Sequence, residues 1–271
     1  GKGMKKLAFI GAGNMGSAIL GGVIKAGVVS PENVTVADLY QPSLDRVKSE
    51  FGVNVTSDSS LAVKDADIVI LAVKPNIING VMKDIRDSID GQKLIVSIAA
   101  ATTIESIENV IGDDKKVVRV MPNTPALVGE GMSALSPNKN VTNDEMDFVV
   151  ELFESFGKAE IVGEYLMDAV VGVSGSSPAY VFMFIEAMAD AAVQTGMPRA
   201  QAYKFAAQSV YGAAKMVLET GKHPGELKDM VCSPGGTTIA AVETLEEHGL
   251  RNAVIKGQIA CVDKSIAMAK K

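Results

Sequence analysis

The sequence has 271 residues, with 26 Lys or Arg against 32 Asp or Glu, so its formal net charge is −6. This balance argues against two classes of partner, nucleic acid and acidic lipid surfaces, because both are bound by basic faces. The length suits one or two domains with a large buried core, and 47% hydrophobic and 21% charged residues are ordinary values for a soluble globular protein.

The cysteines and histidines exclude further classes. Cys232 and Cys261 are too few for a disulfide framework and favour a reducing compartment, so we predict a cytoplasmic protein. His223 and His248 have no partner at metal-ligand spacing, so we predict no metal site. No apolar run approaches the roughly 18 residues that cross a membrane, and we therefore expect no membrane partner.

Short apolar runs alternate with helical stretches in the first half of the chain. Helices are predicted at residues 14–26 and from Pro42 to about Phe51. Strands are predicted at residues 7–10, 34–37, 68–73, 94–98 and 116–120. Because these strands are apolar throughout rather than at alternate positions, both faces of their sheet should be covered. The order predicts an α/β domain with a parallel sheet at residues 4–162.

After Gly163 the strand signals stop. Residues 178–195 are nearly all apolar, with Glu186, Asp190 and Gln194 as one polar stripe, which predicts a helix buried almost all round. Two more long helices are predicted, at residues 199–218 and 250–270. A region of this size has little core of its own to cover such a helix, so a second subunit is the natural cover. We therefore predict an all-helical dimerisation domain at residues 163–271.

The first predicted strand runs into a G-x-G-x-x-G motif that opens a helix, formed by Gly11, Ala12, Gly13, Asn14, Met15 and Gly16. In this context the motif is typical of a Rossmann-type dinucleotide-binding domain. Gly11 allows the tight turn, Gly13 lets a pyrophosphate approach the backbone, and Gly16 lets the helix pack close to the strand. The helix N-terminus then offers free N–H groups to the phosphates. The alternative is a glycine-rich turn without a ligand.

Asp38 ends the second predicted strand, 22 residues after Gly16. A carboxylate there accepts hydrogen bonds from the ribose hydroxyls of NAD and repels the 2′-phosphate of NADP. The residues that follow supply no arginine for that phosphate, and Arg46 is expected a turn or two into the next helix. The sequence therefore favours NADH over NADPH, although Asp38 could instead cap a helix or turn.

The remaining strand ends at the same edge of the sheet are further candidates for cofactor binding. They contribute Ala72, Val73, Lys74, Pro75, Ala99 and Asn123. Lys74 could reach a phosphate or ribose, or be simply solvated. The loop around Asn123 contains two prolines, which suits a stiff wall beside a planar ring or a rigid turn without a role.

Several motifs together resemble one family. They are A-V-K-P at residues 72–75, M-P-N-T-P at 121–125, S-G-S-S-P-A-Y at 174–180, and H-P-G-E-L-K-D at 223–229 followed by S-P-G-G-T-T at 233–238. With the glycine-rich motif they resemble pyrroline-5-carboxylate reductases from Met4 onward, and S-P-G-G-T-T is the most specific part. That family joins a Rossmann domain to a helical dimerisation domain. It reduces a small cyclic imine, 1-pyrroline-5-carboxylate, to L-proline with NADH or NADPH in the last step of proline synthesis.

The resemblance places the substrate site in the S-P-G-G-T-T segment and implicates Ser233, Gly236, Thr237 and Thr238. Thr238 matches the threonine whose hydroxyl meets the substrate nitrogen, so it is the candidate catalytic residue. Met230 stands where some members have asparagine, and Ser177 replaces a common glycine. The resemblance also implies a homodimer at least and allows a ring of dimers.

The residues themselves agree with that site, because a Pro-Gly-Gly-Thr-Thr turn before a helix offers several N–H groups to a small carboxylate. An ordinary threonine N-cap is the alternative. Two other functions compete. A β-hydroxyacid dehydrogenase would use a lysine on the first long helix after the sheet, but residues 170–193 contain none. A non-catalytic dinucleotide sensor would have no need for a second anion-binding turn.

Overall fold

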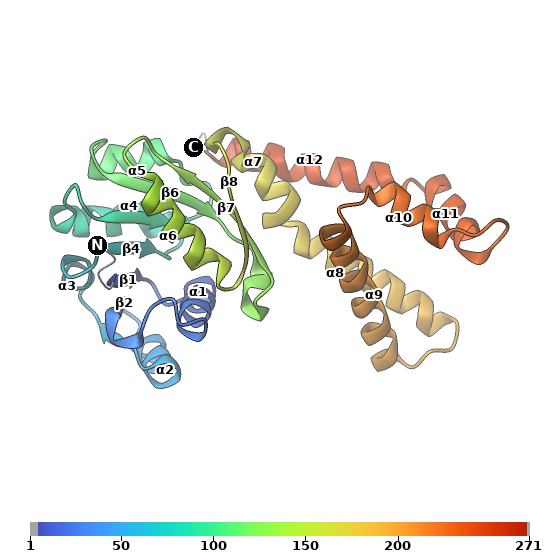
Figure 1. Cartoon of the computed structure of the whole chain (residues 1–271), viewed down its shortest axis with the longest axis horizontal. Helices are drawn as coiled ribbons and strands as arrows, with labels where there is room; N and C mark the ends of the chain where they lie inside the picture. Colours follow the sequence, from blue (N-terminus) through green and yellow to red (C-terminus); the bar gives the residue numbers. More distant parts are fainter. Residues whose placement is uncertain (1–4, 270–271) are drawn as a thin grey trace. The chain divides into compact units, whose positions relative to one another are not determined.

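The computed structural model describes residues 5–269 (Figure 1). By packing, the chain divides into two compact units. Among the described residues, unit 1 comprises residues 5–175 and 262–269, and unit 2 comprises residues 176–261. The domain boundary between residues 162 and 163 stays a prediction, because packing units need not coincide with domains.

Unit 1 is built on a sheet of eight strands in the order β3-β2-β1-β4-β5-β6-β7-β8. Their bounds are β1 (Leu7–Ile10), β2 (Val34–Ala37), β3 (Asn54–Thr56), β4 (Ile68–Leu71), β5 (Leu94–Ser97), β6 (Lys116–Met121), β7 (Gly131–Pro137) and β8 (Gly157–Ile161). All neighbours are parallel except β6 and β7. The predicted strands are all present, although the third ends at Leu71 rather than Val73.

Helices cover both faces of this sheet, as predicted. One face packs against α1 (Asn14–Lys25), α2 (Gln41–Phe51) and α6 (Asn143–Glu154), and the other against α3 (Ser59–Lys64), α4 (Pro75–Ile85) and α5 (Ile104–Ile111). Along β1, Leu7 and Phe9 join the first core while Ala8 and Ile10 join the second. Successive strand side chains point to opposite faces, so a strand apolar throughout is buried on both sides.

Shorter helical turns complete unit 1. They are η1 (Pro31–Asn33), η2 (Arg86–Ser88), η3 (Thr124–Val128), η4 (Glu164–Leu166), α7 (Met167–Val170) and a π-helical turn, η5 (Val171–Gly175). The strands β3, β7 and β8 were not predicted from the sequence. β3 has only three residues, and β7 begins at a glycine and ends at a proline, both of which are unfavourable signals for a strand.

Unit 2 is helical. It contains α8 (Ser177–Gln194), α9 (Arg199–Thr220), α10 (Pro224–Val231), α11 (Thr237–Glu247) and most of α12 (Leu250–Ala269). The predicted long helices are confirmed to within a few residues, although Lys270 lies outside the described residues. No strand follows β8 in residues 162–269. The fold is therefore the predicted one, a Rossmann-type α/β domain followed by a helical region.

The apolar helix α8 is not covered within a single chain. Phe182 and Met183 are 60% and 67% exposed, and Ala189 is the buried residue of this helix. The segment Glu164–Gln194 is long and apolar enough to cross a membrane by length and composition, with 6% of its most apolar window buried. This corrects the expectation that no segment has such a composition. It failed because α8 continues the preceding helical turns, which lengthens the apolar stretch beyond the predicted helix.

Candidate functional site

A cleft of about 580 Å³ opens where β1, β2 and β4 end. The strand order turns back between β1 and β4, since β2 and β3 lie on one side of β1 and the later strands on the other. Open α/β sheets bind ligands at such a switch point. The cleft is lined by Ile10, Gly11, Ala12, Gly13, Ala37, Asp38, Leu39, Ser57, Asp58, Ser59, Ser60, Ala72, Val73, Lys74, Ile77, Val81 and Asp84.

The three motif glycines have the geometry that a dinucleotide needs. Gly11 has φ +104°, and a Cβ there would lie 2.4 Å from the carbonyl oxygen of Ala72. A Cβ on Gly16 would lie 3.0 Å from the Cβ of Ala72, so this glycine brings α1 close to β4. At Gly13 a Cβ would meet nothing within 4 Å, which leaves open space at the mouth of the cleft. A pyrophosphate therefore fits beside Gly13.

The N-terminus of α1 supplies donors to that space. Its N-cap is Gly13, and no side chain caps the helix. Among residues 5–269, no acceptor meets the amides of Gly13, Asn14 and Met15. Free amides at a helix N-terminus bind phosphate through hydrogen bonds and the partial positive charge of the helix dipole.

Asp38 is fixed at the side of the cleft. Its Oδ2 accepts a hydrogen bond from the amide of Ala12 at 2.8 Å, and its Oδ1 accepts one from the amide of Tyr40 at 2.9 Å. A carboxylate can accept about four hydrogen bonds, so lone pairs remain for ribose hydroxyls. The charged residues that line the cleft are Asp38, Asp58, Asp84 and Lys74. Acids outnumber the single cation, which favours a ribose over a ribose phosphate.

The second turn lies in unit 2, between α10 and α11. Gly235 has φ +70°, and the amide of Gly236 donates to the carbonyl of Ser233 at 3.1 Å. The N-cap of α11 is Gly236, with no side-chain cap. Thr237 and Thr238 are thus the first two helical residues, and the alternative of a threonine N-cap is wrong. The first amides of α11 therefore lack intrahelical acceptors.

The two threonines differ in exposure. Thr237 is exposed and Thr238 is half-buried, and within the described residues neither hydroxyl makes a hydrogen bond. Ser233, Gly236, Thr237 and Thr238 are therefore brought together in one turn, in which the amide of Gly236 is bonded to Ser233 while the amides of Thr237 and Thr238 have no intrahelical acceptor. Such a turn can hold a small carboxylate on its amides and a neighbouring polar atom on a hydroxyl.

Comparison with known proteins identifies the family. Residues 164–268 match the family model for the pyrroline-5-carboxylate reductase dimerisation domain, and residues 6–101 match that for NADP oxidoreductases, coenzyme F420-dependent. A pyrroline-5-carboxylate reductase of Escherichia coli (strain K12) is 55% identical over 269 residues, covering 98% of this chain and 99% of the relative. One from Methanosarcina acetivorans is 48% identical over 267 residues, with 98% and 99% covered.

The chain belongs to the pyrroline-5-carboxylate reductase family. Solved structures agree. The Coxiella burnetii pyrroline-5-carboxylate reductase has a TM-score of 0.94 at 34% identity, covering 99% of this chain and 100% of that one. The Plasmodium falciparum pyrroline carboxylate reductase, solved with NADP bound, has a TM-score of 0.88 at 34% identity, with 98% and 100% covered.

Membership of the pyrroline-5-carboxylate reductases makes the chain an NAD(P)H-dependent oxidoreductase. It decides against the hydroxyacid dehydrogenase and the non-catalytic sensor. The dimerisation domain indicates a homo-oligomer.

The structure brings some predicted cofactor residues to the cleft and not others. Seven line it, namely Gly11, Ala12, Gly13, Asp38, Ala72, Val73 and Lys74. Asn14, Met15 and Gly16 form the first turn of α1, and Pro75 is the first residue of α4. Ala99 is buried outside the lining. All of these assignments to a cofactor stay predictions.

Asn123 is engaged within the protein. Its Nδ2 donates to the carbonyl of Ser174 at 3.1 Å, and its Oδ1 accepts from the amide of Met132 at 2.8 Å. The side chain therefore ties β7 to the π-helical turn η5. These bonds were not visible in the sequence, because the partners lie nine and 51 residues away.

Sequence reasoning missed one side of the cleft. Ser57, Asp58, Ser59 and Ser60 lie there after β3, with Ile77, Val81 and Asp84 from α4. The signal that could have found the first group is a polar Ser-Asp-Ser-Ser run. It was not used because the strand before it is too short to stand out.

Proposed function

We propose that this chain reduces 1-pyrroline-5-carboxylate to L-proline with NADH or NADPH as hydride donor, the last step of proline synthesis. The observation that supports this most is the uncapped start of α11 within S-P-G-G-T-T. A cyclic imino acid presents a carboxylate and a ring nitrogen, and this turn offers amides for the carboxylate and a hydroxyl for the nitrogen. The dinucleotide cleft of unit 1 would supply the second half of the reaction.

The cofactor, when bound, supplies a hydride from C4 of its dihydronicotinamide. The chain's own residues have three tasks: holding the pyrophosphate on the amides around Gly13, holding the ribose at Asp38, and holding the imino acid. Aligning donor and acceptor is the main contribution that a protein makes to such a transfer.

Ser233, Gly236 and Thr237 are proposed to bind the substrate carboxylate. The amides at the start of α11 would receive it, and the dipole of this helix favours a negative charge there. The exposed Thr237 hydroxyl and the Ser233 hydroxyl can each donate one more hydrogen bond. These contacts fix which face of the ring is presented.

Thr238 is proposed to meet the imine nitrogen. The imine carbon gains the hydride and its electron pair, and the C=N double bond becomes a single bond. The nitrogen must carry a proton in the product ring. That proton can be present on the imine before binding or pass through the Thr238 hydroxyl, which orients the nitrogen in either case.

The test is Thr238→Ala, with the hydroxyl-retaining Thr238→Ser as its matched control. We expect the alanine variant to lower kcat by about 10- to 1,000-fold, near the range for a lost proton-transfer role. The serine variant should keep most of the activity. Unchanged steady-state parameters in Thr238→Ala would remove Thr238 from the mechanism.

Three finer assignments belong to the same proposal. NADH is preferred to NADPH, supported by Asp38 and the acidic lining of the cleft. The protein is cytoplasmic, supported by two cysteines among the described residues that form no disulfide. The oligomer is a dimer at least, and a ring of dimers is compatible with it. The ratio of kcat/KM for the two cofactors and sedimentation of the purified protein test the first and the third.

A further inference from the structure

We infer that Arg46 is a positioning residue that holds the glycine-rich turn from behind and orients the amide of Gly13 toward the cofactor cleft. Arg46 lies on α2, outside the motif that recognises a dinucleotide. Its Nη2 donates to the carbonyl oxygen of Ala12 at 2.9 Å and to Oγ of Ser17 at 3.0 Å. Ser17 Oγ also donates to the same carbonyl at 3.3 Å.

Both main-chain groups of Ala12 are therefore held by side chains from beyond the turn. The amide donates to Asp38 at 2.8 Å, and the carbonyl accepts from Arg46. Ala12 itself is 2% exposed and both bonds are partly buried, while the Arg46 side chain that makes one of them is exposed. Charge-assisted hydrogen bonds of this kind are stronger than neutral ones.

The orientation of Gly13 follows from peptide geometry. In a planar trans peptide the C=O of one residue and the N–H of the next point in opposite directions. Arg46 fixes the carbonyl of Ala12, so the amide of Gly13 points away from Arg46. Gly13 lines the cleft and Arg46 does not. The hydrogen bond from Arg46 to the Ala12 carbonyl, here called the clamp, thus directs the free amide of Gly13 toward the position of the pyrophosphate.

Arg46 lies on the other side of the turn. It lines a separate hollow of about 670 Å³, together with residues of α1 such as Asn14 and Lys25 and residues of η3 such as Leu127. The guanidinium is therefore directed at the back of the turn rather than at the ribose beside Asp38. Since NADH and NADPH share the same pyrophosphate, the clamp should serve both cofactors equally.

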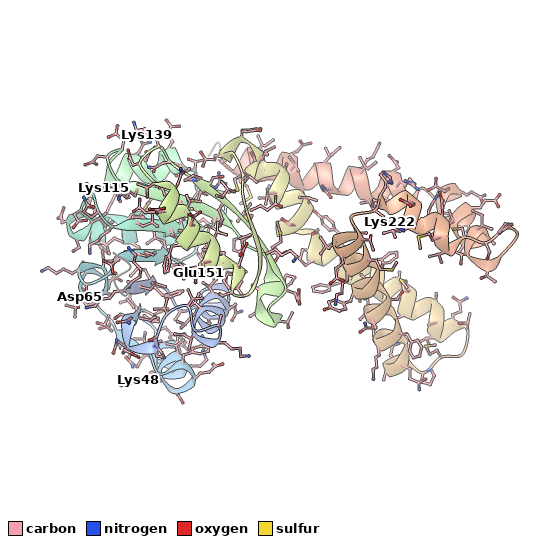
Figure 2. The ribbon with its side chains drawn as sticks, in the orientation of Figure 1. Lys48, Asp65, Lys115, Lys139, Glu151 and Lys222 are labelled. Carbon is pink, nitrogen blue, oxygen red and sulfur yellow. The ribbon has the colours of Figure 1, made fainter. Side chains whose placement is uncertain are left out.

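The experiment measures binding of NADH and of NADPH by cofactor fluorescence, with no imine present. We expect Arg46→Gln to raise both dissociation constants by a similar factor of about 10, the scale of a lost charge-assisted hydrogen bond. Arg46→Lys keeps a charged donor and should recover part of that loss. Lys48→Gln is the matched control, because it removes a charge from the same helix at an exposed position (Figure 2). It should change neither constant.

The outcomes separate the alternatives. If Arg46→Gln weakens NADPH binding and leaves NADH unchanged, Arg46 binds the 2′-phosphate and the inference is wrong. If neither constant moves, the clamp has no role in binding. Thermal unfolding of each variant shows whether a loss of cofactor affinity comes from misfolding. Partial recovery of affinity in Arg46→Lys would show that the loss comes from the missing hydrogen bond. The inference relies on dinucleotide binding alone. It can therefore fail while the proposed imine reduction is confirmed, and it can be confirmed while imine reduction fails.

Discussion

The two turns that lead into α1 and α11 are similar in backbone and different in support. Each ends in a glycine N-cap in extended conformation with no side-chain cap, Gly13 in one and Gly236 in the other. Each contains a glycine at positive φ just before the cap, Gly11 at +104° and Gly235 at +70°. Both therefore present bare amides at a helix start, which suits an anion.

Their surroundings differ. The first turn is packed against Ala72 and is bonded by Asp38 and Arg46. The second is mostly exposed, a Cβ on Gly235 would meet nothing within 4 Å, and its internal bond is the one from Gly236 to Ser233. The cofactor turn is thus preorganised by its own unit. The second turn has no comparable side-chain support among the described residues.

The largest expected effect tests the rigidity of the first turn. Gly11→Ala places a Cβ 2.4 Å from a backbone oxygen at φ +104°. Neither atom can move freely, so we expect NADH affinity to fall at least about 100-fold and stability by about 2–3 kcal/mol. Fluorescence titration and thermal unfolding measure these quantities.

The matched control for Gly11→Ala is Gly27→Ala, at the end of α1. Gly27 has φ +72°, and nothing lies within 4 Å of its Cβ position. Gly27→Ala therefore has the conformational cost of a positive φ, about 1–2 kcal/mol, without steric overlap between the added Cβ and neighbouring atoms. NADH affinity should be unchanged. Wild-type affinity in Gly11→Ala would show that the first turn adapts as readily as the second.

An intermediate effect is expected for Gly235→Ala in the second turn. The substitution adds the strain of φ +70° in open space, so the exposed turn relaxes rather than clashes. We expect KM for the imino acid to rise about tenfold, equivalent to about 1.4 kcal/mol, within the cost of this conformation. NADH affinity should not change.

Gly221→Ala controls for strain alone, because Gly221 ends α9 at φ +66° with open space around it. It should leave KM unaltered. If Gly235→Ala weakens NADH binding as strongly as Gly11→Ala does, the two turns do not act independently and their different support has no functional consequence.

The smallest expected effect tests whether the part of unit 2 outside the Gly235 turn is well packed. The neighbouring side chain of Cys261, together with burial, raises the pKa of Tyr180 to about 12. The folded protein therefore keeps this proton while the unfolded chain loses it near pH 10. The stability due to this contact is complete below about pH 10 and is lost as the pH rises toward 12.

The measurement is tyrosinate absorbance against pH, with Tyr180→Phe as the reference. Subtracting the variant should isolate one group that titrates near pH 12. The variant should also lose less stability than the wild type between pH 10 and 12. A difference curve centred near pH 10 would mean that α8 and α12 do not hold Tyr180 and Cys261 together. Unit 2 would then be loosely packed outside the Gly235 turn as well.

The sequence by itself determined the features that depend on local chemistry. Apolar runs specified the strands, because a parallel strand must be apolar on both faces. Gly11 was predictable because a tight turn between strand and helix needs a positive φ, and Asp38 because it ends the next strand. The S-P-G-G-T-T turn was singled out by its resemblance to the family, and the residues alone left a threonine N-cap open where the structure has a glycine cap.

Only the tertiary structure decided which groups meet across long stretches of chain. Arg46 bonds to a carbonyl 34 residues away, and the amide of Asn123 to a carbonyl 51 residues away. Asp58 and Asp84 reach the cleft because β3 and α4 pack beside it. Such partners follow from packing, which a single sequence read along its length does not specify. The exposed face of α8 is a further case, because the sequence predicts a helix buried almost all round, whereas Phe182 and Met183 are exposed in the single chain.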